Sequence, residues 1–72
     1  MKKTFYVSMG YVGGYRGRAG RVVPVRCTEE ELETVATAVG RGHNADACSV
    51  SLTEEDAWNT FAKPYLVLWD CM

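Results

Sequence analysis

Apolar and polar side chains alternate along residues 3–12, KTFYVSMGYV. Four of them share one side of this stretch: Phe5, Val7, Met9 and Tyr11. A period of two is the pattern of a strand with one buried face. The lysines that precede the apolar stretch are also typical of a secretory signal peptide. Polar residues interrupt it, however, so we interpret residues 3–12 as a strand.

A second alternating stretch, residues 21–27, places three apolar side chains on one face: Val23, Val25 and Cys27. Pro24 lacks the N–H that a strand ladder needs, which predicts an edge strand. A two-residue turn at Gly13-Gly14 would pair Phe5 with Val22, and the apolar faces of the two strands would then point apart. We therefore expect a longer or bulged loop between the strands.

A helical pattern follows Thr28, with apolar residues three and four positions apart: Leu32, Val35, Ala36 and Val39. Thr28 and Glu31 have the spacing of a capping box, in which each side chain bonds the other residue's backbone N–H. Gly40 and Gly42 are expected to end this helix.

The rest of the chain predicts a strand over residues 47–52, a second helix and a last strand. The second helix begins after Thr53 and continues to about Ala62, because Pro64 stops it. Residues 65–71 form a nearly continuous apolar run. Such a run is typical of a strand buried on both faces or covered by a partner.

The predicted order is therefore ββαβαβ in a single compact domain, residues 1–72. We expect an α+β fold: a four-stranded, mostly antiparallel or mixed sheet with two helices on one face. The first strand should be internal and the second should lie at the edge. No apolar run reaches the roughly 18 residues that a membrane span requires.

Charge is divided between the two parts of the chain. Residues 1–27 carry six basic residues and no acidic one, whereas residues 28–72 carry two basic and nine acidic residues. The net charge of −1 conceals this division. It predicts a basic and an acidic face, which would govern association more than folding.

The basic part centres on residues 10–21, GYVGGYRGRAGR, which hold five of the seven glycines. Arginines could neutralise phosphates and tyrosines could stack on bases. The stretch has neither the Gly-Lys-Ser/Thr of a Walker loop nor the residue order of the RNA-recognition octamer. The alternative is a solvated hairpin without a partner. The candidate contact residues here are Tyr11, Tyr15, Arg16, Arg18 and Arg21.

Two acidic clusters, residues 29–33 and 54–56, stand at the predicted helix N-termini, where the helix dipole favours carboxylates. The dipole explains most of them. The alternative is an anionic surface that imitates nucleic acid and blocks a basic groove, with Glu30 and Glu33 as contact residues.

The soft metal ligands of the chain are few and widely spaced: Cys27, His43, Cys48 and Cys71. This spacing fits neither a disulfide framework nor a zinc site. His43, Asp46 and Cys48 could be assembled into a nucleophile set, but residues on one short loop and strand rarely reach triad geometry. We expect reduced, buried thiols, no metal, no cofactor and no catalytic residue.

Four aromatic side chains cannot all share one small core: Tyr6, Trp58, Tyr65 and Trp69. We expect Trp58 in the core. Those left on an uncovered sheet face would mark a dimer or partner surface.

The sequence thus predicts a cytoplasmic, non-enzymatic binding protein, an inhibitor or adaptor that docks on a larger protein or nucleoprotein complex. Small size, split charge and the absence of catalytic motifs are typical of phage or plasmid accessory proteins, including anti-CRISPR-type inhibitors, although no residue motif carries this similarity. The alternative is a nucleic-acid-binding module that uses residues 10–21. A homodimer stays open, and no membrane partner is expected.

Overall fold

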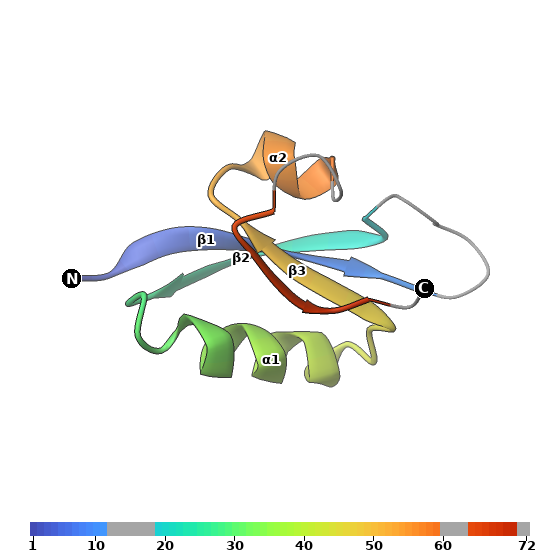
Figure 1. Ribbon diagram of the computed structural model, residues 1–72, viewed down its shortest axis with the longest axis horizontal. Coiled ribbons are helices and arrows are strands. Elements are labelled where there is room, and N and C mark those ends of the chain that lie inside the picture. The colour runs from blue at the N-terminus through green and yellow to red at the C-terminus, as the bar shows by residue number, and fades with distance from the viewer. Residues whose placement is uncertain (12–18, 60–63, 71–72) are drawn as a thin grey trace.

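The computed structural model describes residues 1–11, 19–59 and 64–70, which form one four-stranded sheet and two helices (Figure 1). The elements are β1 (Lys3–Gly10), β2 (Arg21–Cys27), α1 (Leu32–Gly42), β3 (Ala47–Ser51), α2 (Glu54–Trp58) and β4 (Leu66–Trp69). The strand order is β2-β1-β3-β4, and each neighbouring pair is antiparallel. The predicted α+β class and element order are confirmed, with β1 internal and β2 at an edge.

The register of β1 and β2 brings their apolar faces together. Phe5 lies opposite Val25, and Val7 lies opposite Val23. The tight turn rejected above would have shifted this pairing, so the expectation of a longer connection is confirmed. Residues 12–18 of that connection lie outside the described residues.

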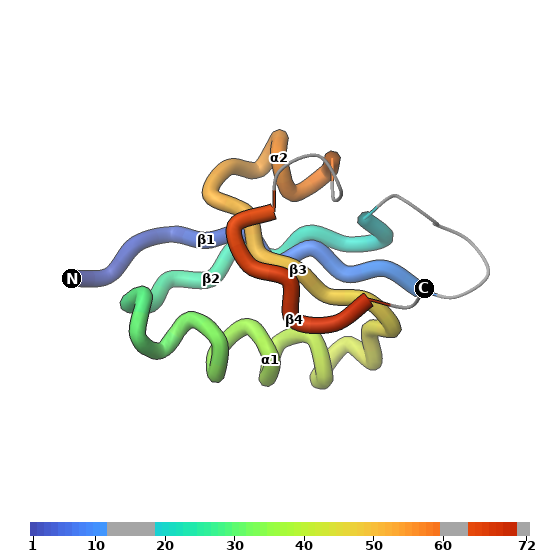
Figure 2. The backbone as a smooth tube through the Cα atoms, in the orientation of Figure 1, coloured from blue at the N-terminus to red at the C-terminus, as the bar shows by residue number. Residues whose placement is uncertain are grey.

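The main core lies between the sheet and α1, which runs along one face of the sheet (Figure 2). Its most buried members come from β1, β2, β3 and α1: Phe5, Val7, Met9, Cys27, Leu32, Ala36, Cys48 and Val50. The alternation of β1 and the three- and four-residue spacing of α1 put these side chains on facing surfaces.

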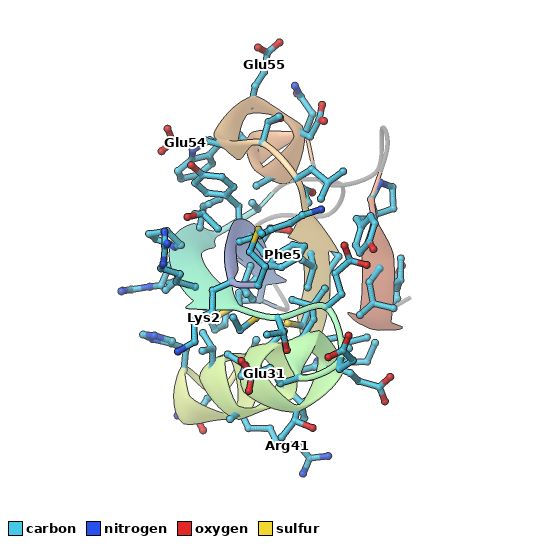
Figure 3. All side chains as sticks on the ribbon, turned by 90° about the vertical axis from the view of Figure 1, so that its left-hand side faces the viewer. Lys2, Phe5, Glu31, Arg41, Glu54 and Glu55 are labelled. Atoms are coloured by element: carbon cyan, nitrogen blue, oxygen red, sulfur yellow. The ribbon has the colours of Figure 1, made fainter. Side chains whose placement is uncertain are left out.

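The second helix lies on the opposite face of the sheet (Figures 1 and 3), so the expectation of both helices on one face is wrong. This face carries three buried serines: Ser8, Ser49 and Ser51. The Ser8 and Ser49 hydroxyls are hydrogen-bonded at 2.8 Å. The physical reason is topological. The α2 segment joins two adjacent antiparallel strands, β3 and β4, and such a connection needs no crossover on a fixed face.

The predicted capping box forms one turn before the first residue of α1. The Thr28 N–H donates to Glu31 Oε1 at 3.0 Å, and the Glu31 N–H donates to Thr28 Oγ1 at 3.3 Å. The helix does not end at Gly40. It ends at Gly42, after which Asn44 adopts a left-handed backbone with φ of 56°. The Ala45 N–H then donates to the Gly40 carbonyl at 3.0 Å, which completes a Schellman motif.

Gly40 is a contact residue inside α1. A Cβ built there would lie 2.8 Å from Cys48 Sγ and 2.8 Å from the Trp69 ring, whereas a Cβ at Gly42 meets nothing within 4 Å. The missing side chain at Gly40 therefore lets the helix approach β3 and β4 closely.

We expect opposite effects from the same substitution at these two glycines. Gly40→Ala should lower the free energy of unfolding by about 1–2 kcal/mol, because overpacking exceeds the gain in helix propensity. Gly42→Ala should raise it by about 0.5 kcal/mol through propensity alone. Urea unfolding of both variants measures this. Equal stabilisation by both substitutions would show that Gly40 is less closely packed against Cys48 and Trp69 than described.

The C-terminal elements are shorter than predicted. Thr53 Oγ1 accepts from the Asp56 N–H at 3.1 Å and caps α2, which covers Glu54–Trp58. The predicted extension towards Ala62 enters residues outside the description. β4 is an edge strand whose side chains are half-buried or exposed, so it is not buried on both faces. Neither described helix has the length and apolar character to cross a membrane.

Candidate interaction surface

Tyr11 fixes the point at which the glycine-rich loop leaves the sheet. Its hydroxyl donates to the His43 carbonyl at 2.9 Å, after the end of α1. Its ring lies so close to Gly20 that a Cβ there would be 2.9 Å from Tyr11 Cδ2. The Gly20 N–H donates to the Met9 carbonyl at 2.6 Å. Tyr11 is therefore half-buried and hydrogen-bonded at the base of the loop, and its partner-binding role stays a prediction.

The other predicted residues of the loop divide into two groups. Arg21 is exposed at the start of β2, opposite Met9 in the register. Three lie outside the described residues: Tyr15, Arg16 and Arg18. The structure therefore places the base of the candidate contact surface and one of its arginines.

Exposed basic side chains lie on β2 and on the neighbouring strand β1. Arg21 lies opposite Met9 and Arg26 lies opposite Thr4, so these two exposed arginines project from opposite faces of β2. Lys3 pairs with Glu29 at 3.0 Å. Both of these side chains are more than half exposed, so the pair contributes little stability.

The acidic residues form two surfaces, not one. Glu30 and Glu33 are exposed at the start of α1, whereas Glu54 and Glu55 are exposed at the start of α2. Because the helices lie on opposite faces, the two groups are separated by the sheet. Figure 3 shows Glu54 and Glu55 at one side, Glu31 at the other and Lys2 between them. A single acidic face, as the charge division suggested, does not form.

The described thiols are buried and protonated. Cys48 points at the Ala36 carbonyl of α1, at 4.0 Å, and burial raises the pKa of its thiol to about 11. Burial, and next the negative charge of Glu31, raise the pKa of Cys27, while Lys2 acts in the opposite direction. A thiol is nucleophilic as its thiolate, so neither group is activated at neutral pH.

The remaining candidates for chemistry are not assembled around these thiols. His43 is exposed at the end of α1, whereas Cys48 faces the helix from within the core. Within residues 1–11, 19–59 and 64–70, no group of three or more His, Cys, Asp or Glu side chains could hold a metal ion. Cys71 lies outside this description.

The sequence did not predict which large apolar side chains are exposed. Trp58 was expected in the core but is 50% exposed, because α2 is short and buries Ala57 instead. Trp69 packs against the core, and its Nε1–H donates to the Ala45 carbonyl at 3.2 Å. Within residues 1–11, 19–59 and 64–70, the exposed large apolar side chains other than Met1 come from the chain between β3 and β4 or from β4 itself: Leu52, Trp58, Tyr65 and Val67. The continuous apolar run at residues 65–71 was the sequence signal for this surface.

The described surface thus offers charged groups at the β2 edge, carboxylates at two helix starts and apolar side chains near β4. These groups can bind a partner through charge and burial of apolar area. Comparisons of the chain with protein-family models, with curated proteins and with solved structures give no match.

Proposed function

We propose that this chain is a small, cytoplasmic, non-enzymatic binding protein that acts as an inhibitor or adaptor on a larger host protein or nucleoprotein complex. The observation that carries the proposal is the arrangement of exposed charge. Arginines project from both faces of the β2 edge, and carboxylates stand at the starts of helices on both faces of the sheet. Charges arranged in this way favour steering and specificity in association.

The chemistry of the described thiols supports binding over catalysis. Enzyme sites bring groups with perturbed pKa values together where substrate can reach them. Here the raised pKa values belong to Cys27 and Cys48, which are buried in the core. The proposed biological setting is that of phage or plasmid accessory proteins, including anti-CRISPR-type inhibitors.

Residues 10–21 are the proposed contact segment. The carboxylates at the helix starts have a local structural reason to be there, since each stabilises its helix terminus. Arg16 and Arg18 stand among glycines that offer no packing. Tyr11 anchors one end of this segment to the His43 carbonyl after α1, and Gly20 anchors the other end to Met9 of β1.

The test compares the two charged surfaces in one binding assay. Complexes captured from host extract are first identified by mass spectrometry, and the affinity for the purified partner is then measured. The Arg16→Ala, Arg18→Ala double variant should lose affinity by about 100-fold, within the range for desolvated charges at interfaces. Its stability should change by less than about 0.5 kcal/mol.

Matched variants make the result specific. Arg41→Ala removes an exposed arginine from the last turn of α1 and should leave binding unchanged. Glu30→Lys with Glu33→Lys reverses charge on the first acidic surface. If this pair abolishes binding while the loop variant retains it, the acidic surface is the contact and it imitates nucleic acid.

A second function, nucleic-acid binding through the same loop, is favoured by the exposed arginines of the strand that follows it. Arg21 and Arg26, which project from opposite faces of β2, would contact phosphates that approach this edge of the sheet. The affinity for DNA or RNA should then fall steeply as salt concentration rises. The net charge of −1 opposes this function. An absence of binding to either nucleic acid at low salt would exclude it.

A further inference from the structure

The two helices rest on chemically different faces of the sheet. α1 covers the main core, to which it contributes the buried side chains of Leu32 and Ala36. α2 lies over β1, β2 and β3 on the opposite face (Figures 1 and 3), and its buried residue is Ala57. Because burial of apolar area is the main force that holds a helix on a sheet, α2 is held more weakly than α1.

The sheet surface on the α2 side is polar. This serine face carries Ser8, Ser49 and Ser51, each at most 4% exposed. The Ser8 and Ser49 hydroxyls bond each other at 2.8 Å, whereas Ser51 Oγ has no hydrogen-bond partner in the part of the chain that the structure describes. A hydroxyl buried without a partner gives up its hydrogen bonds to water and gains none in return. Burial of Ser51 therefore opposes the closed position of α2.

Local hydrogen bonds shape α2. The Ala57 N–H donates to the Thr53 carbonyl at 3.1 Å, and the Asn59 N–H donates to the Glu55 carbonyl at 3.2 Å. These bonds move with the helix and do not tie it to the sheet. A helix of five residues is too short to be stable in water by itself, so α2 depends on its small contact with the serine face.

We infer that α2 is a cover that opens locally: it leaves the serine face while β1, β3 and α1 stay folded around the main core. Segments with few buried apolar contacts open at a lower free energy than the whole domain. Opening returns the Ser51 hydroxyl to water, which offsets part of the lost burial of Ala57. β4 keeps its own contact on the α1 side, since Trp69 Nε1–H donates to the Ala45 carbonyl. A partner that bound the bared serines would shift the protein towards the open state.

Native-state hydrogen exchange of the full chain, followed by NMR at low urea concentrations, tests the inference. After correction for intrinsic rates, the Ala57 and Asn59 amides should exchange about 100-fold faster than the Val35 amide of α1, which donates to the Glu31 carbonyl. Exchange in α2 should not depend on urea, because local opening exposes little surface. Exchange of Val35 should accelerate with urea, because it requires unfolding of the whole domain.

Two substitutions in β3 separate local opening from global unfolding. Val50 is fully buried in the main core, so Val50→Ala weakens the closed and open forms equally relative to the unfolded chain. It should accelerate exchange of Val35 by roughly tenfold or more and leave that of Ala57 and Asn59 unchanged. Ser51→Ala removes the unpartnered hydroxyl from the other face of the same strand. It should slow exchange of Ala57 and Asn59 by about tenfold.

Thiol labelling tests whether the serine face itself is bared. In Ser51→Cys with Cys71→Ser, N-ethylmaleimide should modify the introduced thiol about 100-fold faster than Cys48, which lies in the same strand beneath α1. Fraying of the ends of α2 would leave the introduced thiol unreactive, so this measurement distinguishes detachment from fraying. Circular dichroism checks that the variant is folded, and the amide measurements on the wild-type chain need no variant.

Two outcomes would overturn the inference. The first is that Val50→Ala accelerates exchange of Ala57 and Asn59 as much as that of Val35, because α2 would then open only when the whole domain unfolds. The second is that the thiol introduced by Ser51→Cys is as unreactive as Cys48, which would mean that α2 stays closed on the serine face.

Discussion

Phe5→Ala is expected to lower the free energy of unfolding by about 3–5 kcal/mol, the range for removing a buried phenylalanine. Phe5 is fully buried in β1, and its ring centroid lies 5.9 Å from that of Tyr65. A chain of 72 residues has a total stability of roughly 4–11 kcal/mol. The substitution should therefore remove a large part of the stability and leave a measurable unfolded population at 37 °C.

Tyr6→Ala is the matched control for this prediction. Tyr6 is the next residue in β1, half-buried on the opposite face, and its loss should cost about 1 kcal/mol. Urea unfolding followed by circular dichroism measures both variants. A smaller loss for Phe5→Ala than for Tyr6→Ala would mean that the main core lies on the α2 face.

The ring contact between Phe5 and Tyr65 can be measured separately. A double-mutant cycle with Tyr65→Ala should give a coupling energy of about 0.5–1.5 kcal/mol, the range for aromatic pairs. This coupling would show that the turn before β4 depends on the β1 core. A coupling near zero would mean that Tyr65 lies against Phe5 without stabilising it.

The strands and the first helix could be predicted because their signals are local. Alternation located β1, β2 and β3, and the capping residues located the start of α1 to within one turn. The longer connection between β1 and β2 could be predicted from the strand register. Slipping the register by one residue would turn Val23 and Val25 away from the core, so the apolar pattern selects one pairing.

The helix positions could not be predicted in the same way. Alternation shows that Ser49 and Ser51 share a face, but not that a five-residue helix covers it. The role of Gly40 was misjudged because glycine ends many helices. Glycine suits this position because Cys48 and Trp69, which are far away in the sequence, lie so close that a Cβ would clash with them. Such contacts are set by tertiary packing and leave no local pattern.

The candidate interaction surface was also predictable in part from the sequence and in part only from the structure. Composition singled out residues 10–21, and the structure adds that Tyr11 and Gly20 hold its base. The edge position of β4 depends on the strand order, because the same apolar run would be a central strand in another topology. The sequence likewise does not show that the acidic residues form two surfaces, because this depends on the two helices lying on opposite faces of the sheet.

Raising the pH should destabilise the protein through Cys48. Its thiol has a pKa of about 11 in the folded chain, raised by burial from 9.0. Below pH 9 the thiol is protonated in both folded and unfolded states, so it adds no pH dependence. Between pH 9 and 11 the unfolded chain releases this proton and the folded chain does not. Stability therefore falls as the pH rises, by about 1.4 kcal/mol per pH unit and roughly 3 kcal/mol in total.

Cys48→Ala isolates this contribution from the other groups that titrate at alkaline pH. Urea unfolding at pH 7, 9, 10 and 11 under reducing conditions should show a shallower loss for Cys48→Ala than for the wild-type chain. Val50→Ala creates a cavity in the same strand without removing a titrating group, so its deficit should stay constant with pH. If the Cys48→Ala deficit is constant as well, the thiol must ionise equally in both states. Water would then reach Cys48 in the folded protein, and its place beneath α1 would be wrong.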